Sequence, residues 1–312
     1  MDKFAYNIYS LVKENQLIKA GDKILVSLSG GLDSVSLFRV LLHIRESMEF
    51  DLHLCHFHHG LRQDSDQEQE FVQELSKETL VPFTVHSTKH LSEGGDLQNR
   101  ARQWRYEKLR NMQEENGFSK IALGHHLNDL METQLWKMMR GGSLFGLAPM
   151  QIEMFPFIRP LLYTSKEELK AWCIKLGYEW REDNTNQQNN YTRNRIRNQI
   201  VPYLKQNGFD KMEEKMLSFF RDALSLREFF EESVPAEQYK SDALDFGVIS
   251  RLPRIFALET IHQFLLYHKV EEIHRSNIEE IYRLVKENRG NWKINLKSGR
   301  IALGIKKQIR LQ

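Results

Sequence analysis

The chain has 312 residues and a mass of 37.0 kDa, a length that suggests about two domains. Hydrophobic residues make up 41% and charged residues 28% of the sequence, an ordinary globular profile that excludes a fibrous or disordered chain. The 44 basic and 42 acidic side chains leave a net charge of +2, which excludes a histone-like or acidic-tail protein but not local charged patches.

The cysteines and the apolar runs narrow the class further. Cys55 and Cys173 are too few for a disulfide framework and too far apart for a CxxC site. No apolar run approaches the roughly 18 residues that a membrane span needs. The first residues are too polar for a signal peptide. We therefore expect a soluble, cytoplasmic protein with no membrane contact.

Short apolar runs alternate with helical patterns between residues 23 and 124. The helical segments have apolar residues three and four positions apart. Strands that alternate with helices predict an α/β fold, a doubly wound parallel sheet whose ligands bind beyond the C-terminal ends of the strands. The predicted strands are Lys23–Ser29, Asp51–Phe57, Pro82–His86 and Lys120–Gly124, and the predicted helices are Leu32–Ile44, Asp66–Thr79 and Leu97–Asn116.

Helical patterns dominate the rest of the chain. Ser165, with Glu168 three residues later, has the pattern of a capping box and predicts a helix that ends at Leu176. We place the domain boundary near Asn207-Gly208, which gives domains of residues 1–207 and 208–312, the second smaller and mostly helical. The other predicted elements are helices at Tyr191–Leu204, Lys211–Phe230, Ile255–His268 and Asn277–Glu287, and a β-like tail at Trp292–Leu296 and Arg300–Lys306.

The strongest motif, Ser29-Gly30-Gly31-Leu32-Asp33-Ser34, follows a predicted strand and begins a helix. The glycines allow a tight turn close to a ligand, and a helix N-terminus suits a phosphate. Ser29 and Ser34 add hydroxyl donors. Phosphate would repel Asp33 unless a cation lay between them, so Asp33 is the candidate Mg²⁺ ligand. The alternative is a plain glycine turn with an Asp or Ser cap, but strand, turn and helix follow each other in the order that a phosphate site needs.

This motif is not the P-loop, because GxxxxGK[ST] is absent. It resembles the pyrophosphate loop of the adenylating ATP-pyrophosphatase family, whose members split ATP between its α and β phosphates. Four further stretches resemble, in order and spacing, the tRNA(Ile)-lysidine synthetases of that family. The family often has two acids where this chain has Asn128-Asp129. The four stretches are His56–Arg62, Ala101–Tyr106, Gly124–Thr133 with Arg140–Gly142 and Gly146-Leu147, and Asp183–Asn186 with Arg193–Arg197 and Pro202.

The resemblance implies a tRNA-modifying ligase that uses ATP and Mg²⁺. ATP would adenylate the oxygen at carbon 2 of the wobble cytidine in the CAU anticodon of isoleucine tRNA, and free L-lysine would then displace AMP. The ATP site would be Ser29–Ser34. We assign catalytic roles to Asp33, Arg105 and His125. Arg105 and Arg102 would offset the charge of the ATP phosphates. The alternative for these arginines is surface ion pairing with Glu107 or Asp96.

Two carboxylates after the fourth predicted strand suit a cationic ligand. On a helix, the spacing of His125, Asp129 and Glu132 places them on one face. The two acids would suit an ammonium group or a second Mg²⁺. Together with the resemblance, this assigns Asp129 and Glu132 to lysine binding. The alternative is a solvated helix face with a capping histidine. The only cysteine beside the histidines at 56, 58 and 59 is Cys55, which lies inside a predicted strand, and we expect no zinc.

Basic residues in two segments favour RNA contact. Arg193, Arg195 and Arg197 have no acid among them, which suits RNA phosphates. The same segment also fits an amphipathic helix that buries Ile196 and Ile200, and the two interpretations are compatible. From residue 289 to the last residue the chain has seven basic residues and no acid. We assign the three arginines and this basic tail to tRNA contact, although such a tail also fits a merely solvated charge run.

The alternative enzyme is a tRNA thiolase with the same fold. Thiolation needs a sulfur carrier, usually a reactive cysteine. Cys55 lies in a predicted strand and Cys173 in a predicted helix, which suits buried structural thiols instead. A non-enzymatic alternative is an RNA-binding module with a decayed nucleotide site, but the intact Asp33 and Ser34 argue against it.

Overall fold

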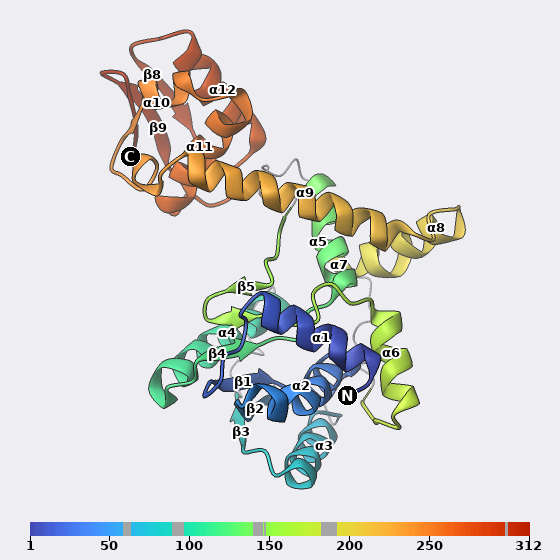
Figure 1. Cartoon of the computed structure of the whole chain (residues 1–312). Coiled ribbons are helices and arrows are strands. Elements are labelled where there is room, and N and C mark those ends of the chain that lie inside the picture. Colours follow the sequence, from blue (N-terminus) through green and yellow to red (C-terminus); the bar gives the residue numbers. More distant parts are fainter. Residues whose placement is uncertain (59–63, 89–96, 140–145, 147, 182–191, 297–298) are drawn as a thin grey trace. The chain divides into compact units, whose positions relative to one another are not determined.

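A computed structural model describes residues 1–58, 64–88, 97–139, 146, 148–181, 192–296 and 299–312 (Figure 1). These residues form two compact units, each with its own buried core. The first unit comprises Met1–Leu130 and Met150–Asn194, and the second comprises Met131–Pro149 and Arg195–Gln312. None of the helices in the described ranges is long and apolar enough to cross a membrane.

The two units differ from the single cut that we expected near residue 207. The second unit takes in most of helix α5 (Leu127–Met139) as well as the C-terminal part of the chain. Met131 on α5 is buried in one cluster with Ile196 and Met212. The apolar face of α5 therefore joins the later helices, which a cut along the sequence cannot express.

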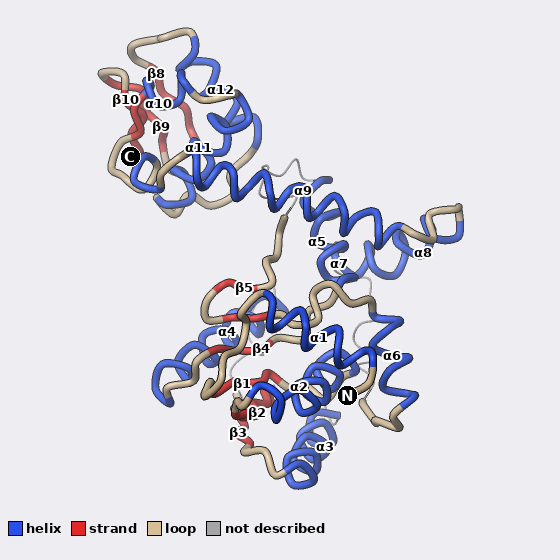
Figure 2. Tube along the Cα trace, viewed as in Figure 1, coloured by secondary structure: helices blue, strands red, loops and turns tan. Residues whose placement is uncertain are grey.

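A six-stranded sheet with the order β3-β2-β1-β4-β6-β5 forms the centre of the first unit (Figure 2). The first five strands of this order are parallel, and β5 is an antiparallel edge strand. The predicted doubly wound α/β fold is thus confirmed. The strands are β1 (Lys23–Ser27), β2 (Asp51–His58), β3 (Phe83–Ser87), β4 (Lys120–Ala122), β5 (Glu153–Met154) and β6 (Phe157–Ile158).

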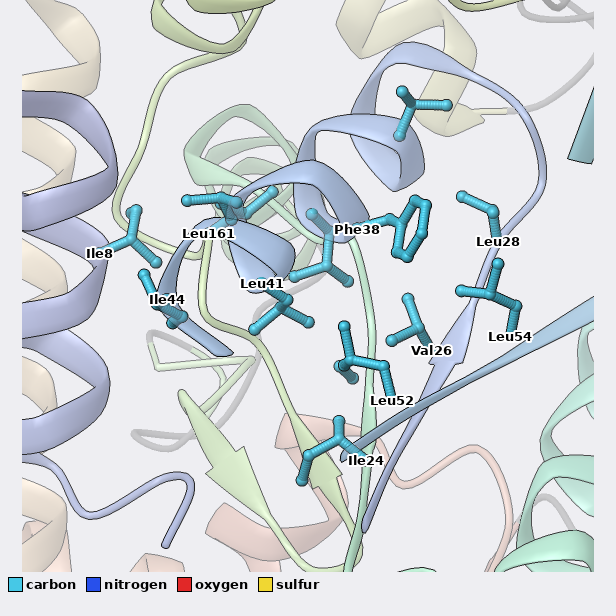
Figure 3. Close-up of a cluster of buried hydrophobic side chains, with 14 of the residues drawn as sticks. Ile8, Ile24, Val26, Leu28, Phe38, Leu41, Ile44, Leu52, Leu54 and Leu161 are labelled. Carbon is cyan, nitrogen blue, oxygen red and sulfur yellow. The ribbon is translucent and has the colours of Figure 1, made fainter. Parts of the chain in front are cut away.

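Helices cover both faces of this sheet because its inner strands bury residues on both sides. Ile24 and Val26 of β1 belong to one core, to which helices α1, α2, α3 and α6 contribute (Figure 3). Leu25, between them, points to the opposite face and packs with Leu109 of helix α4. The helices are α1 (Lys3–Glu14), α2 (Leu32–Met48), α3 (Asp64–Thr79), α4 (Leu97–Asn116) and α6 (Lys166–Lys175).

Helices and a four-stranded antiparallel sheet, ordered β7-β10-β9-β8, make up the second unit. The predicted β-like tail corresponds to β8 and β9, which lead into an unpredicted strand β10. The predicted helix Tyr191–Leu204 is instead α7, a π-helical turn (Ile196–Ile200) and α8. The elements are α7 (Thr192–Arg195), α8 (Val201–Gln206), α9 (Met212–Ser233), α10 (Phe246–Arg251), α11 (Arg254–Tyr267), α12 (Arg275–Lys286), β7 (Leu244–Asp245), β8 (Trp292–Asn295), β9 (Ile301–Ile305) and β10 (Gln308–Leu311).

Strand β10 was missed because its turn carries no turn signal. Lys306 and Lys307 connect β9 to β10, with φ angles of 50° and 60°. A two-residue hairpin turn with both φ angles positive usually has Asn-Gly or a similar pair. Two lysines in these positions read as part of a charged tail.

Gly304→Val is expected to destabilise the second unit. Gly304 pairs with Trp292 across β8 and β9, and a Cβ atom on Gly304 would lie 2.2 Å from the indole. The indole stacks on Phe246 with ring centroids 6.1 Å apart, so it cannot move without losing that contact. Overpacking of this kind costs about 1–3 kcal/mol. Thermal denaturation measures the loss, and Leu303→Val, its partly exposed neighbour, is the control. Equal losses in both variants would contradict this reason.

Candidate functional site

The loop Ser29–Ser34 links the end of β1 to the first turn of α2. Gly30 has a φ of 91°, in the left-handed region that favours glycine. The Ser34 hydroxyl donates to the Gly31 carbonyl oxygen at 3.0 Å and accepts from the Ser29 backbone N–H at 3.1 Å. The two hydroxyl oxygens lie 3.0 Å apart, and the Leu32 side chain is buried in the core. The loop is therefore held in shape at the N-terminus of α2, where an anion is favoured.

The end of β4 lies against this loop because β1 and β4 are neighbours in the sheet. Gly124 is at the contact, since a Cβ atom there would lie 3.0 Å from the Asp33 carbonyl oxygen. The missing side chain lets the two backbone segments approach. The strand order reverses at this point of the sheet, which is where α/β folds bind ligands. The fold thus joins two motifs that are far apart in the sequence.

Two basic side chains flank the Asp33 carboxylate. His126 Nε2 lies 3.4 Å from Asp33 Oδ2 and 3.5 Å from Asp129 Oδ2. Lys166 Nζ lies 3.8 Å from Asp33 Oδ1. Burial lowers the pKa of the His126 imidazole, but the carboxylates of Asp129 and Asp33 outweigh burial and raise this pKa above its usual value. The two acids thus favour the protonated imidazole, which would offset part of their charge.

The Asp33 carboxylate fits a divalent cation. Its Oδ1 atom is buried and has no hydrogen-bond partner among the described residues. Carboxylate oxygens are hard ligands of the kind that Mg²⁺ prefers. No group of three metal-ligating side chains converges in the described ranges. A Mg²⁺ ion at Asp33 would then take most of its ligands from phosphate and water, as Mg²⁺ commonly does.

A basic group lies at the other side of the β4 end. Arg159 is buried, and its Nε donates to His125 Nδ1 at 3.3 Å. Burial and the nearby guanidinium groups of Arg159, Arg102 and Arg105 lower the pKa of His125 to about 3, although Asp129 opposes them. His125 is thus neutral at physiological pH, with its proton on Nε2. Burial also lowers the pKa of Arg105, so its cation is poorly hydrated and acts strongly on a nearby anion.

The helical placement of His125 was wrong, because α5 begins at Leu127. His125 precedes the helix and does not share a helical face with Asp129 and Glu132. Asn128 contacts the start of α6, where its Oδ1 accepts a hydrogen bond from the Lys166 backbone N–H at 2.9 Å. An aspartate, which the family often has here, offers the same acceptor.

Within the second unit, Glu132 and Arg197 form a two-point ion pair. Arg197 Nε donates to Glu132 Oε1 at 2.7 Å, and Nη2 donates to Oε2 at 2.8 Å. The Glu132 side chain is 3% exposed. Arg195 is exposed, and the side chain of Arg193 lies outside the described residues. The expected RNA and lysine residues Arg197 and Glu132 are therefore bonded to each other.

Sequence reasoning gave no role to three residues at the site, His126, Lys166 and Arg159. Arg159 could have been recognised from the sequence, because it is a single arginine within the otherwise apolar run Phe157–Leu162. His126 and Lys166 gave none, since their contacts with Asp33 depend on strand order and on the position of α6. The motif residues 59–62, 140–142, 147 and 183–186 lie outside the described part of the chain.

Residues 1–204 match the model of the PP-loop domain family. The chain is also similar to curated proteins named tRNA(Ile)-lysidine synthase. It is 35% identical to that of Pseudothermotoga lettingae, over 66% of this chain and 47% of that protein. It is 30% identical to that of Thermosipho africanus, over 87% of this chain and 61% of that protein. The chain thus spans about half the length of the curated relatives it matches.

Among solved structures, the fold is similar to that of the U34-tRNA thiolase NcsA from Methanococcus maripaludis, which has a [4Fe-4S] cluster. The TM-score is 0.59, over 72% of this chain and 79% of that one. The sequences are 16% identical. This likeness concerns the fold alone.

Proposed function

This chain belongs to the PP-loop domain family, and we propose that it is an ATP-dependent ligase that forms lysidine in isoleucine tRNA. The observation that carries the proposal is the contact between the loop Ser29–Ser34 and the segment after β4. That contact joins an anion site, a carboxylate suited to a cation and a basic group made up of the buried Arg159 with Arg102 and Arg105. The relatives named tRNA(Ile)-lysidine synthase support the choice of reaction.

In the first step, the oxygen at carbon 2 of the cytidine would attack the α-phosphorus of ATP and release pyrophosphate. The loop Ser29–Ser34 would hold the phosphates at the N-terminus of α2. A Mg²⁺ ion held by Asp33 would offset their negative charge. Arg105, as a desolvated cation, would stabilise the charge that develops as pyrophosphate leaves. Neutral His125, oriented by Arg159, would donate a hydrogen bond through Nε2.

In the second step, the lysine ε-amine would attack carbon 2, lose one proton and displace AMP. Asp129 and Glu132 are the proposed lysine-binding residues. Both Glu132 oxygens accept from Arg197, and a carboxylate oxygen can accept more than one hydrogen bond. Arg197 would then position Glu132 for the amine as well as contact RNA, while Arg193 and Arg195 would contact RNA phosphates.

The outer face of the second unit's sheet supports a tRNA-contacting role for residues 208–312. Leu303 pairs with Lys293 on one side and with Arg310 on the other, so the three side chains form one row. Lys293 and Arg310 are exposed, whereas Ile294 and Ile309 next to them are buried. Lysine and arginine in a row on an uncovered sheet face suit an RNA backbone.

A tRNA thiolase remains the alternative, and its requirement for a reactive sulfur can be tested. Both cysteines are buried, and burial raises the pKa of Cys55 to about 12. A buried thiol that stays protonated is a poor nucleophile. We expect the double variant Cys55→Ala/Cys173→Ala to keep its turnover within about threefold, as for a structural packing change. Lost turnover in a variant whose circular dichroism is unchanged would favour thiolation.

The decisive experiment is incubation with ATP, Mg²⁺, labelled lysine and a transcript of isoleucine tRNA with the CAU anticodon. Label in the RNA, together with stoichiometric AMP, is the expected result. A transcript with cytidine 34 replaced by uridine should remain unlabelled. Incorporation of sulfur or ammonia in place of lysine would overturn the proposal.

A further inference from the structure

Lys166 is a cation at the Asp33 site to which the proposed reaction gives no role. It is the first residue of α6, and its Nζ lies 3.8 Å from Asp33 Oδ1. The side chain of Lys166 is 44% exposed and that of Asp33 is 35% exposed. Both side chains are therefore partly accessible to a ligand.

The backbone of Lys166 is fixed at both sides. Its N–H donates to Asn128 Oδ1 at 2.9 Å, which ties α6 to the first turn of α5. Ser165 and Glu168 complete a capping box, with the Glu168 N–H donating to Ser165 Oγ at 3.2 Å. The predicted capping box is thus confirmed. The lysine stem, by contrast, has four rotatable methylene groups, so Nζ can move while its backbone stays in place.

The contact between Lys166 and Asp33 is weak. Its distance is beyond hydrogen-bond range, and Asp33 Oδ1 has no hydrogen-bond partner in the described part of the chain. Half-exposed ion pairs contribute little to stability. The ion pair with Asp33 therefore contributes little to fold stability, and stability alone does not explain why a lysine stands at position 166. A compact ammonium group does, however, suit a phosphate.

We propose that Lys166 is a phosphate-binding residue of the ATP site. Asp33 is the second residue of α2, so a phosphate at the N-terminus of α2 lies beside Asp33 and within reach of Lys166 Nζ. When ATP binds, Nζ leaves Asp33 for a phosphate oxygen, and the Asp33 carboxylate becomes available to a cation. This inference rests on the proposed ATP-dependent function and adds a residue to its nucleotide site.

Calorimetric titration of ATP into the whole chain, in EDTA without Mg²⁺, tests the inference apart from catalysis. Lys166→Gln is expected to weaken ATP binding about tenfold, the loss for one charge-assisted hydrogen bond. Lys166→Arg should stay within about threefold of the unaltered chain, because it keeps the charge. The control is Lys170→Gln, an exposed lysine one turn along α6, which should bind ATP normally.

A double-variant cycle with Asp33→Asn separates a direct phosphate contact from simple neutralisation of Asp33. A direct contact predicts the same tenfold loss from Lys166→Gln in both backgrounds. Loss of the effect in the Asp33→Asn background would overturn the inference, as would normal ATP binding by Lys166→Gln alone. If the unaltered chain bound no ATP, the proposed function itself would fail.

Discussion

Asp33→Ala is expected to reduce AMP formation from ATP by about 100- to 1000-fold, a loss typical of removing a main electrostatic group of an active site. Asp33 is the acid that the fold places where the loop after β1 meets the segment after β4. Its loss would leave the phosphates without their proposed Mg²⁺ ligand. Binding of tRNA should change less than about twofold, because backbone phosphates dominate RNA affinity. The two measurements are AMP release and filter binding of labelled tRNA.

The control for this variant is Asp51→Ala. Asp51 is another acid of the first unit, and it is exposed, but it is the first residue of β2, whereas the proposed site lies beyond the C-terminal strand ends. Its replacement should leave AMP formation unchanged. Normal AMP formation by Asp33→Ala, or loss of tRNA binding without loss of AMP formation, would remove Asp33 from the nucleotide site.

Arg197→Ala is expected to destabilise the second unit by about 3 kcal/mol, the lower end of the cost of breaking a buried ion pair, because the Arg197 side chain is partly exposed. The change would leave Glu132, whose side chain is 3% exposed, without its two-point partner. Urea denaturation, followed by far-ultraviolet circular dichroism, measures the loss. The double variant Glu132→Gln/Arg197→Ala should recover part of it, because a neutral amide is less costly to bury than a carboxylate.

Arg195→Ala is the matched control, because Arg195 is an exposed arginine of the same segment. Its replacement should change the free energy of unfolding by less than about 0.5 kcal/mol. It should still weaken tRNA binding if Arg195 contacts a phosphate. Equal stability of the Arg197→Ala and Arg195→Ala variants would show that the Glu132 pair does not hold the unit together.

The alternation of strands and helices was enough to predict the parallel sheet, because strands buried on both faces read as short continuous apolar runs. The capping box at Ser165 and helix α4 could also be predicted, because each depends on residues that lie close together in the sequence. The glycine loop could also be recognised, because its strand, turn and helix are consecutive. Local patterns thus gave the elements and the anion site.

Contacts across the sheet could not be predicted in this way. The closeness of His126 to Asp33 depends on β4 lying next to β1, and no local pattern carries that order. The role of Asn128 depends on where α6 begins relative to α5. The π-helical turn at Ile196–Ile200 shifts the register of the arginines, which an ideal helical wheel cannot represent. These contacts depend on tertiary structure and therefore could not be predicted from local sequence patterns.

The turn at Lys306 and Lys307, between β9 and β10, combines backbone strain with positive charge. Both residues have positive φ angles, a backbone conformation that costs of order 1 kcal/mol or more for each residue other than glycine. An Asn-Gly pair would form the same turn with far less strain. The chain has instead two positive charges at the tip of a hairpin. The two lysines therefore add positive charge to this hairpin at the expense of backbone strain in the turn.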